Sequence, residues 1–222
     1  MRKILLGTFL FFLPLALFSD ILTFRLGSTM LKQESDLWQI NRENLYLKKN
    51  DFNGKFFSGE FEFRTRKFKN LSFSFEYSSY ERSKVTSYRD YEYSDGSPIT
   101  QTLKLKITPL EINMKYYPLG LLGTMIPYFG AGTGIYFWNY QQEGDFIDFN
   151  DYSIFTGSYN TSTQDFGANL RAGLIFKISN SIGLTGDAKY IWLKGKLSDE
   201  FQGFEKFDLN GFYFSFGISF LF

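Results

Sequence analysis

The sequence contains no cysteine and no histidine among its 222 residues. Without cysteine the chain has no disulfide framework and no thiolate ligand or nucleophile. Without histidine it lacks the commonest general base and the commonest metal ligand. Its 24 basic and 23 acidic residues give a formal net charge of +1, so bulk charge indicates neither nucleic acid nor a strongly charged partner. We therefore expect no cofactor, no metal site and no nucleic-acid partner.

Beyond the N-terminus the sequence also lacks an apolar run long enough for a helix to cross a bilayer. Aromatic residues, by contrast, make up 21% of the chain, and 28 residues are phenylalanine. So many rings need either a very large core or an apolar surrounding outside the protein. Mean hydropathy is nevertheless −0.20. This combination favours membrane-spanning strands of alternating polarity over membrane-spanning helices.

The N-terminus is typical of a secretory signal peptide. A basic start of residues 1–3 is followed by an apolar run over residues 4–18. Cleavage after Ser19 would begin the mature chain at Asp20. A membrane anchor is the alternative, because Leu17 is a poor residue three positions before the cut. This interpretation divides the chain into a signal peptide, 1–19, and one β-barrel domain, 20–222.

Alternation of apolar and polar residues with a period of two recurs in eight segments, and no helical periodicity of useful length follows residue 19. The segments span residues 21–30, 55–65, 71–79, 102–117, 127–138, 166–177, 182–192 and 211–222. In the fourth segment the apolar phase slips at Thr108 and Pro109. Because proline cannot donate to a strand ladder, we expect a bulge or a strand start there.

The connections between these segments alternate in length. Long connections are expected at 30–54, 80–100 and 139–163, with a medium one at 194–208, whereas the short ones span 66–70, 118–124 and 179–181. Short turns on one side and long loops on the other are typical of an up-and-down barrel in the outer membrane. We predict an all-β fold, an eight-stranded antiparallel up-and-down transmembrane β-barrel, exported to the bacterial outer membrane and surrounded by its lipids.

One face of the alternating segments is apolar, and ten charged residues are assigned to the other face. They are Arg25, Glu60, Glu62, Arg64, Glu76, Glu111, Lys115, Arg171, Asp187 and Lys189. An Arg or Lys facing lipid at mid-bilayer costs about 2–4 kcal/mol, so this set is predicted to face the interior. The interior of an eight-stranded barrel is just wide enough for side chains to fill. We expect the opposite charges to pair and plug it, with Gly130, Gly132 and Gly134 leaving room.

One stretch of the sequence resembles the small outer-membrane β-barrel superfamily, which includes OmpW-like, OmpX-like and opacity-protein-like domains. Its strand ends in Lys115-Tyr116-Tyr117, and a turn then leads to Tyr128 and the alternating glycines 130, 132 and 134. Residues 165–192 resemble the next hairpin of that group, and Phe222 resembles its C-terminal assembly signal. The resemblance implies the barrel-assembly machinery and periplasmic chaperones as partners during biogenesis. It implies no catalytic residue, because the group includes solute channels, adhesins and barrels of unknown role.

The connection 139–163 is the candidate binding loop. Asp145, Asp148 and Asp151 alternate there with aromatic residues, and the connection has no Lys or Arg. Carboxylate oxygens suit a hard cation such as calcium, and exposed rings suit a surface partner, although EF-hand spacing is absent. The stretch 32–53 is interpreted as a β-extension in which Trp38 and Leu45 pack together.

Several functions remain open. A structural or surface-interaction role, as an adhesin or binding protein with an unknown ligand, is the first hypothesis. A channel for small or hydrophobic solutes is implied by the resemblance and opposed by the interior charges. Ser-His chemistry is unavailable. An enzyme would have to use Glu60 with Glu62, or Glu76 with Glu111, and we expect no enzymatic activity. A soluble lipocalin-like carrier would place the rings inside and the charges outside.

Overall fold

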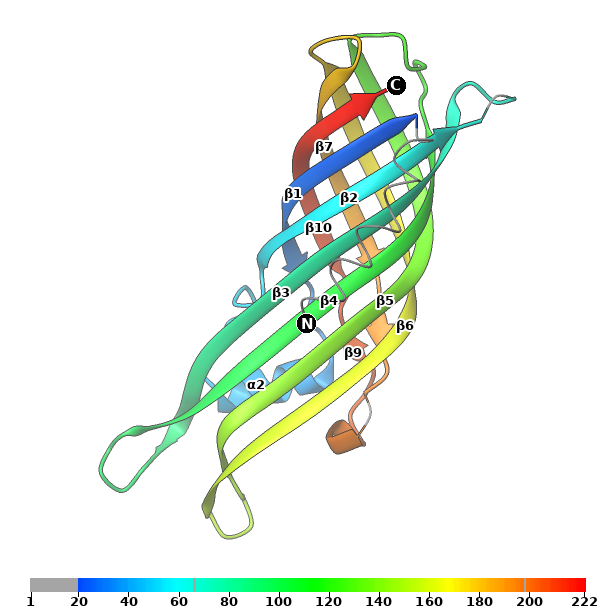
Figure 1. Cartoon of the computed structure of the whole chain (residues 1–222). Helices are drawn as coiled ribbons and strands as arrows, with labels where there is room; N and C mark the ends of the chain where they lie inside the picture. Colours follow the sequence, from blue (N-terminus) through cyan, green and yellow to red (C-terminus); the bar gives the residue numbers. More distant parts are fainter. Residues whose placement is uncertain (1–19, 66, 198) are drawn as a thin grey trace, which may run out of the picture.

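The computed structural model describes residues 20–65, 67–197 and 199–222, so the expected signal peptide lies outside the described residues. Within this part of the chain, eight strands close into an antiparallel barrel in the order β1-β10-β7-β6-β5-β4-β3-β2 (Figure 1). The barrel strands are β1 (Ile21–Leu31), β2 (Gly54–Arg64), β3 (Leu71–Glu92), β4 (Pro98–Tyr116), β5 (Met125–Ile147), β6 (Ile154–Lys177), β7 (Ile182–Trp192) and β10 (Gly211–Leu221). The predicted fold class is confirmed.

The first and last strands close the barrel. β1 pairs antiparallel with β10 along its whole length, from Ile21 opposite Leu221 to Leu31 opposite Gly211. The Phe222 amide continues the ladder by donating to the Asp20 carbonyl oxygen at 2.9 Å. Because every barrel strand has two neighbours, the backbone groups are paired around the ring, as a strand in lipid requires.

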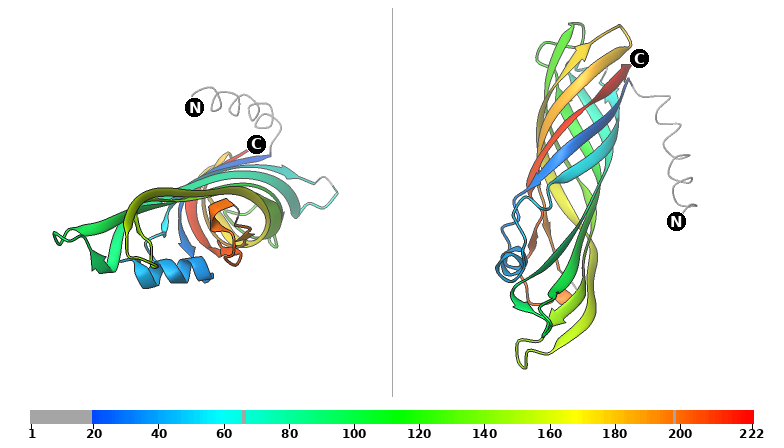
Figure 2. Two further views of the ribbon diagram at one scale, coloured as in Figure 1. Left: turned by 90° about the horizontal axis from the view of Figure 1, so that it is seen from below. Right: turned by 90° about the vertical axis from the view of Figure 1, so that its left-hand side faces the viewer.

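The eight strands differ in length, which corrects two of the expected loops. β1, β2, β7 and β10 have 11 residues each, whereas β3 to β6 have 22, 19, 23 and 24. The stretches 80–100 and 139–163 are therefore mostly strand, with tight turns only at 93–97 and 148–153. Figures 1 and 2 show the two hairpins projecting from the end of the barrel opposite the C-terminus. Their polar composition suggested loops because these strands leave the apolar surrounding.

We call the end with the connections 65–70, 117–124 and 178–181 the turn end, and the opposite end the loop end. The β3–β6 extension is the part of these four strands that continues beyond their neighbours at the loop end, residues 81–92, 98–107, 138–147 and 154–163. The regular side-chain alternation of the barrel continues into it, so the extension has an inner and an outer face.

The predicted break at Thr108 and Pro109 is wrong. β4 runs through both residues, and its register with β5 stays constant from Tyr116 opposite Phe129 to Gln101 opposite Gly144. Odd-numbered residues of β4 face inward throughout. The apolar phase changes because the interior itself changes, from charged residues in the barrel to an apolar layer in the extension. The register irregularity that involves β4 lies instead in its pairing with β3, between Ser87 and Glu92 of β3.

Two connections fold over the loop end. The first contains helix α2 (Asp36–Asn44), and the second contains β8 (Lys194–Gly195), the 3-10 helix η1 (Asp199–Phe201) and β9 (Phe207–Asp208). The β-extension expected at 32–53 is therefore wrong. Leu37, Trp38 and Asn41 are buried on one side of α2, a face too short to stand out as helical periodicity. In the part of the chain that the structure describes, no helix has the length and apolar character needed to cross a membrane.

The outward face of the barrel is an apolar band. Its rings and aliphatic side chains are exposed, as in Leu26 at 73%, Phe166 at 81% and Phe216 at 61%. Over the barrel this face has no charged side chain between Phe212 and Phe220 of β10, or between Leu110 and Tyr116 of β4. An exposed apolar surface of this size on a closed barrel belongs in the hydrocarbon of a membrane. The chain is an eight-stranded barrel of the outer-membrane type.

Candidate functional site

A row of carboxylates crosses three neighbouring strands inside the barrel. Glu60 of β2 lies directly opposite Glu76 of β3, and Glu76 lies directly opposite Glu111 of β4. All three residues are at most 4% exposed. Like charges directly opposite one another on a sheet repel, and buried charges need partners. The row is therefore tolerable only if cations reach it from elsewhere in the barrel.

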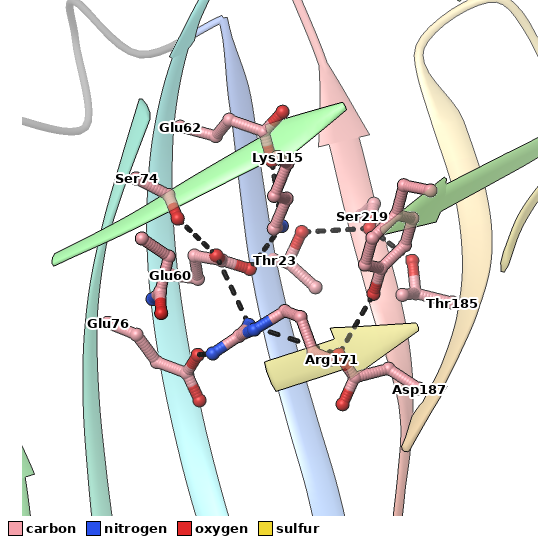
Figure 3. A network of polar contacts seen from close by, with 12 residues as sticks. Thr23, Glu60, Glu62, Ser74, Glu76, Lys115, Arg171, Thr185, Asp187 and Ser219 are labelled. Carbon is pink, nitrogen blue, oxygen red and sulfur yellow. Dashed lines mark hydrogen bonds and ion pairs between the residues drawn. The ribbon is translucent and has the colours of Figure 1, made fainter. Parts of the chain in front are cut away.

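Two cations reach this row from the facing side of the barrel. Arg171 of β6 lies 2.5 Å from Glu76, 3.4 Å from Glu111 and 3.5 Å from Glu60, measured between guanidinium nitrogen and carboxylate oxygen. Figure 3 shows its side chain lying across the interior. The Lys189 ammonium of β7 lies 2.7 Å from Glu111 and 3.1 Å from Glu76. One guanidinium thus bridges three strands.

Two further cations complete the cluster beside Glu60. Arg25 Nη2 of β1 lies 2.5 Å from Glu60 Oε2, and Lys115 Nζ of β4 lies 2.7 Å from the same oxygen. Lys115 also lies 2.8 Å from Glu62. Asp187 of β7 lies 3.9 Å from Arg171 and accepts hydrogen bonds from the hydroxyls of Tyr128 and Ser215. Each of these charged side chains is at most 5% exposed.

We define the interior charge cluster as these nine residues, four cations and five anions. They are Arg25, Glu60, Glu62, Glu76, Glu111, Lys115, Arg171, Asp187 and Lys189. Hydroxyl groups satisfy further carboxylate oxygens, with Ser74 donating to Glu60 at 2.5 Å and Ser72 to Glu62 at 2.6 Å. The Tyr117 and Tyr136 hydroxyls also donate, to Glu62 and Glu111. Dense pairing of this kind holds buried charges in place without making them strongly stabilising.

Arg64 does not belong to this cluster. Its guanidinium lies at the turn end, where it bonds Asp20 at 3.0 Å and the Phe222 carbonyl oxygen at 3.1 Å. The side chain is 38% exposed. Alternation along β2 predicts an interior position for Arg64, but the strand ends at this residue, and there the inward face opens to water. Its role is to join the two ends of the closing strands.

The glycines of β5 make room for one cation of the cluster. A Cβ at Gly130 would lie 2.9 Å from Arg171 Cγ, closer than packed atoms allow. Gly130 pairs with Arg171 on the adjacent strand β6. The space therefore serves a neighbouring side chain, whereas the sequence suggested side chains arriving from across the barrel.

An apolar layer lies on the loop-end side of the charge cluster. Trp38 of α2 is fully buried, and its ring stacks on Phe207 of β9 at 4.7 Å and meets Phe52 at 4.9 Å between centroids. The Trp38 indole donates to the Asp208 carbonyl oxygen at 3.0 Å. We call this group, with the inward residues beneath it, the apolar cap. Its residues are Leu37, Trp38, Leu45, Phe52, Leu103, Leu105, Ile107, Tyr136, Trp138, Tyr140, Phe207 and Leu209.

The cap and the charge cluster meet at Tyr136. Its ring belongs to the apolar cap, while its hydroxyl donates to Glu111 of the charge cluster. At the turn end, a smaller apolar group of Tyr117, Ile126, Tyr128 and Ile175 lies on the other side of the charges. The cap was not predicted from the sequence. The signal was present in the inward run of Leu103, Leu105 and Ile107, which was interpreted as a slipped strand phase.

The three acidic residues of the candidate binding loop lie in and beside the β5–β6 hairpin turn. Asp145 accepts from the Thr156 hydroxyl at 2.7 Å, Asp148 from the Asn150 amide at 2.9 Å, and Asp151 from the Ser153 amide at 2.9 Å. The Thr156 bond lowers the pKa of Asp145, and the bonds from Ser153 lower the pKa of Asp151. Among the described residues, no group of three or more acidic side chains is placed to hold a metal ion. The carboxylates act locally, as hydrogen-bond acceptors that shape the turn.

Comparisons with known proteins add resemblances of low identity. No protein-family model matches the chain, and no curated protein matches its sequence. Neisserial surface protein A is 13% identical, with a TM-score of 0.49 over 91% of this chain and 96% of that one. Ail, the attachment invasion locus protein of Yersinia pestis, is 13% identical, with a TM-score of 0.45 over 92% and 99%. The outer membrane protease OmpT from Escherichia coli is 10% identical, with a TM-score of 0.42 over 92% and 96%. The fold assignment rests on the strand order and outward face described above, and no function is transferred from these proteins.

Proposed function

We propose that the protein is an integral outer-membrane barrel with a closed interior, and that it acts through the surface projecting at its loop end. The observation that carries this proposal is that the interior charge cluster fills the barrel and the apolar cap covers it. Arg171 joins carboxylates of β2, β3 and β4 by ion pairs, and the Trp38 and Phe207 stack covers the same interior from the loop end. A solute would have to separate buried ion pairs and displace packed rings. Breaking a buried pair costs about 3–5 kcal/mol.

The projecting surface supports a contact role. Phe149 and Tyr152, in the β5–β6 turn, are 50% and 62% exposed, and both rings lie about 6 Å from Tyr91 near the end of β3. Exposed aromatic residues are enriched at protein interfaces. On the outer face of the extension, Lys104 and Glu143 form an ion pair at 2.6 Å, so this face is suited to water. The turns at 93–97 and 148–153 are thus held on a stiff sheet away from the membrane.

A conductance measurement tests the closed interior. The refolded protein is inserted into planar bilayers, and its folding is verified by the shift in electrophoretic mobility between heated and unheated samples. We expect no unitary conductance steps from folded protein. Reproducible steps would contradict the closed interior and favour the alternative, a channel for small or hydrophobic solutes.

Site-specific labelling tests the location and the orientation. Because the chain has no cysteine, Tyr152→Cys and Leu122→Cys each introduce a single thiol. In intact bacteria, a membrane-impermeant maleimide is expected to label the first variant, at the loop end, and to leave the second, at the turn end, unlabelled until the outer membrane is permeabilised. Labelling of both variants in the soluble fraction would instead support the lipocalin-like carrier.

For assembly, we propose that Phe222 is read by the barrel-assembly machinery, with periplasmic chaperones as earlier partners. Its ring is 70% exposed, so it contributes little to packing in the folded barrel. Phe222→Ala should then lower the amount of folded protein in the outer membrane while leaving refolding in detergent micelles unchanged. Equal defects in both settings would show a structural role only.

A further inference from the structure

The turn end carries positive charge that the described chain does not neutralise. Arg64, Lys67, Lys69 and Lys177 lie there, and the Asp20 carboxylate beside them is already bonded to Arg64 at 3.0 Å. Lys67 and Lys69 are exposed and have no ion-pair partner among the described residues. Lys177 Nζ donates to the Leu121 carbonyl oxygen at 2.7 Å, a neutral partner that leaves its charge uncompensated. Lys67 and Lys69 are therefore the two cations that the described part of the turn end presents to an external anion.

The turn end also exposes large apolar side chains. Leu122 is 98% exposed and Leu119 is 73% exposed, both in the connection between β4 and β5. Ile178 and Phe68, in the other two connections, are 62% and 56% exposed. Turns that face only water rarely concentrate such residues, because each one forgoes the free energy of burial. All three turns thus combine exposed apolar side chains with nearby ammonium or guanidinium groups.

These turns continue the apolar band without a gap. Ile178 is the second residue after the exposed Phe176 of β6, and Leu119 is the third after the exposed Tyr116 of β4. At about 3.3 Å per residue, this places them within about 10 Å of the edge of the band. The headgroup layer of a bilayer occupies about that depth beyond the hydrocarbon. Apolar side chains in this layer lie at the acyl boundary, and neighbouring cations reach phosphate oxygens.

From this arrangement we infer that the turn end of the barrel binds anionic phospholipid headgroups, through Lys67 and Lys69 and through the exposed leucines. Continuity with the lipid-facing band favours lipid over a soluble acidic protein. On the outer face of the β3–β6 extension, by contrast, Lys104 and Lys106 pair with Glu143 at 2.6 Å and Glu81 at 4.0 Å. The inference rests on insertion of the barrel in a membrane, but it does not depend on whether the interior is closed.

Lipid binding tests this inference directly. The full barrel is refolded in mixed bilayers of phosphatidylcholine and phosphatidylglycerol, and the lipids retained by the protein are counted by native mass spectrometry. The test variant is Lys67→Gln with Lys69→Gln. The matched control is Lys48→Gln with Lys49→Gln, a pair of exposed lysines in the connection after α2 at the loop end. Folding of each protein is verified by heat-modifiable mobility.

We expect the native protein to retain phosphatidylglycerol in preference to phosphatidylcholine. Each lysine near an anionic surface contributes up to about fivefold in binding, so the test variant should lose several-fold enrichment while the control keeps it. Added salt should weaken the preference of the native protein because it screens the attraction. In a second arm, Leu119→Ser with Leu122→Ser should lower the unfolding midpoint in bilayers but leave it unchanged in short-chain detergent micelles.

Four results would overturn the inference. One is an unchanged phosphatidylglycerol preference in the Lys67 and Lys69 variant, and another is an equal loss in the control. The third is displacement of the lipid by inorganic phosphate under conditions where sodium chloride of the same ionic strength leaves it bound, which would identify a free phosphate site. The fourth is the absence of any preference in the folded native protein, which would favour an acidic protein as the occupant of the turn end. Failure to fold into bilayers at all would be seen in the mobility assay, and would count against the membrane placement instead.

Discussion

The rings of Trp38 and Phe207 stack with their centroids 4.7 Å apart and their planes 20° from parallel. Trp38 comes from the connection after the first strand and Phe207 from the connection before the last strand. The stack therefore joins the two connections that flank the closing seam, and both rings belong to the same buried cluster as Leu103, Leu105 and Ile107. The loop end of the barrel is covered by this contact between distant parts of the chain.

A double-mutant cycle measures the contribution of this stack. Trp38→Ala and Phe207→Ala should each lower the free energy of unfolding by about 3–5 kcal/mol, because both side chains are buried. Their coupling should be about 0.5–1.5 kcal/mol, as for an aromatic pair in contact. Ile40→Ala, on the exposed side of the same helix, should change stability by no more than about 0.5 kcal/mol. Urea unfolding in micelles provides the measurement, and a coupling near zero would show that the two connections pack independently.

Removal of Arg171 should be among the most damaging single changes in the barrel. Arg171→Met leaves Glu60, Glu76 and Glu111 short of a shared cation, which should cost about 3–5 kcal/mol. Adding Glu76→Gln to this variant should recover part of the loss, since one uncompensated carboxylate is removed. Arg64→Met, at the exposed turn end, should cost no more than about 1 kcal/mol. Similar losses for Arg64 and Arg171 in equilibrium unfolding would contradict the distinction between rim and interior.

Gly134 should not tolerate a methyl group. Its Cβ would lie 2.3 Å from the Leu110 carbonyl oxygen, and a backbone atom cannot move aside cheaply. Gly134→Ala is expected to cost about 1–3 kcal/mol. Gly186 of β7 is the matched control, because a Cβ there meets no heavy atom within 4 Å. Gly186→Ala should be neutral or stabilising by about 0.4–1 kcal/mol, since alanine restricts the unfolded chain. Equal effects of the two substitutions would show that the local space does not decide the outcome.

The β5–β6 turn should lose order in acid. Hydrogen bonds lower the pKa of Asp145 and of Asp151 in the folded protein. A lowered pKa means that this stabilisation is fully present above the unfolded value, about 3.9, and is lost as pH falls through the folded value. Amide exchange at Ser153, which donates to Asp151, should therefore accelerate only in that acidic range. Asp151→Asn should abolish most of this pH dependence at Ser153, whereas persistence of the same titration would assign it to another group.

Much of the barrel was accessible from period-two alternation alone. Alternation at β10, with Phe212, Phe214 and Phe216 on one face, identified both the strand and its lipid side. The same reasoning failed for β3 to β6 beyond the membrane. There the outer face becomes polar, as at Lys104 and Asn139, so the pattern ceased to look like a membrane strand although the backbone ladder continued.

The sequence by itself indicated the type of fold, because eight alternating segments rich in aromatic residues, joined by connections of alternating length, are typical of a closed barrel surrounded by lipid. Tertiary structure decided which charges meet. The row of Glu60, Glu76 and Glu111 depends on strand register, and the three-way contact of Arg171 depends on its reach across the interior. It also decided that Arg64 stays outside and that Trp38 meets Phe207. These contacts join residues far apart in the chain, whose distance is set by barrel closure and not by local sequence pattern.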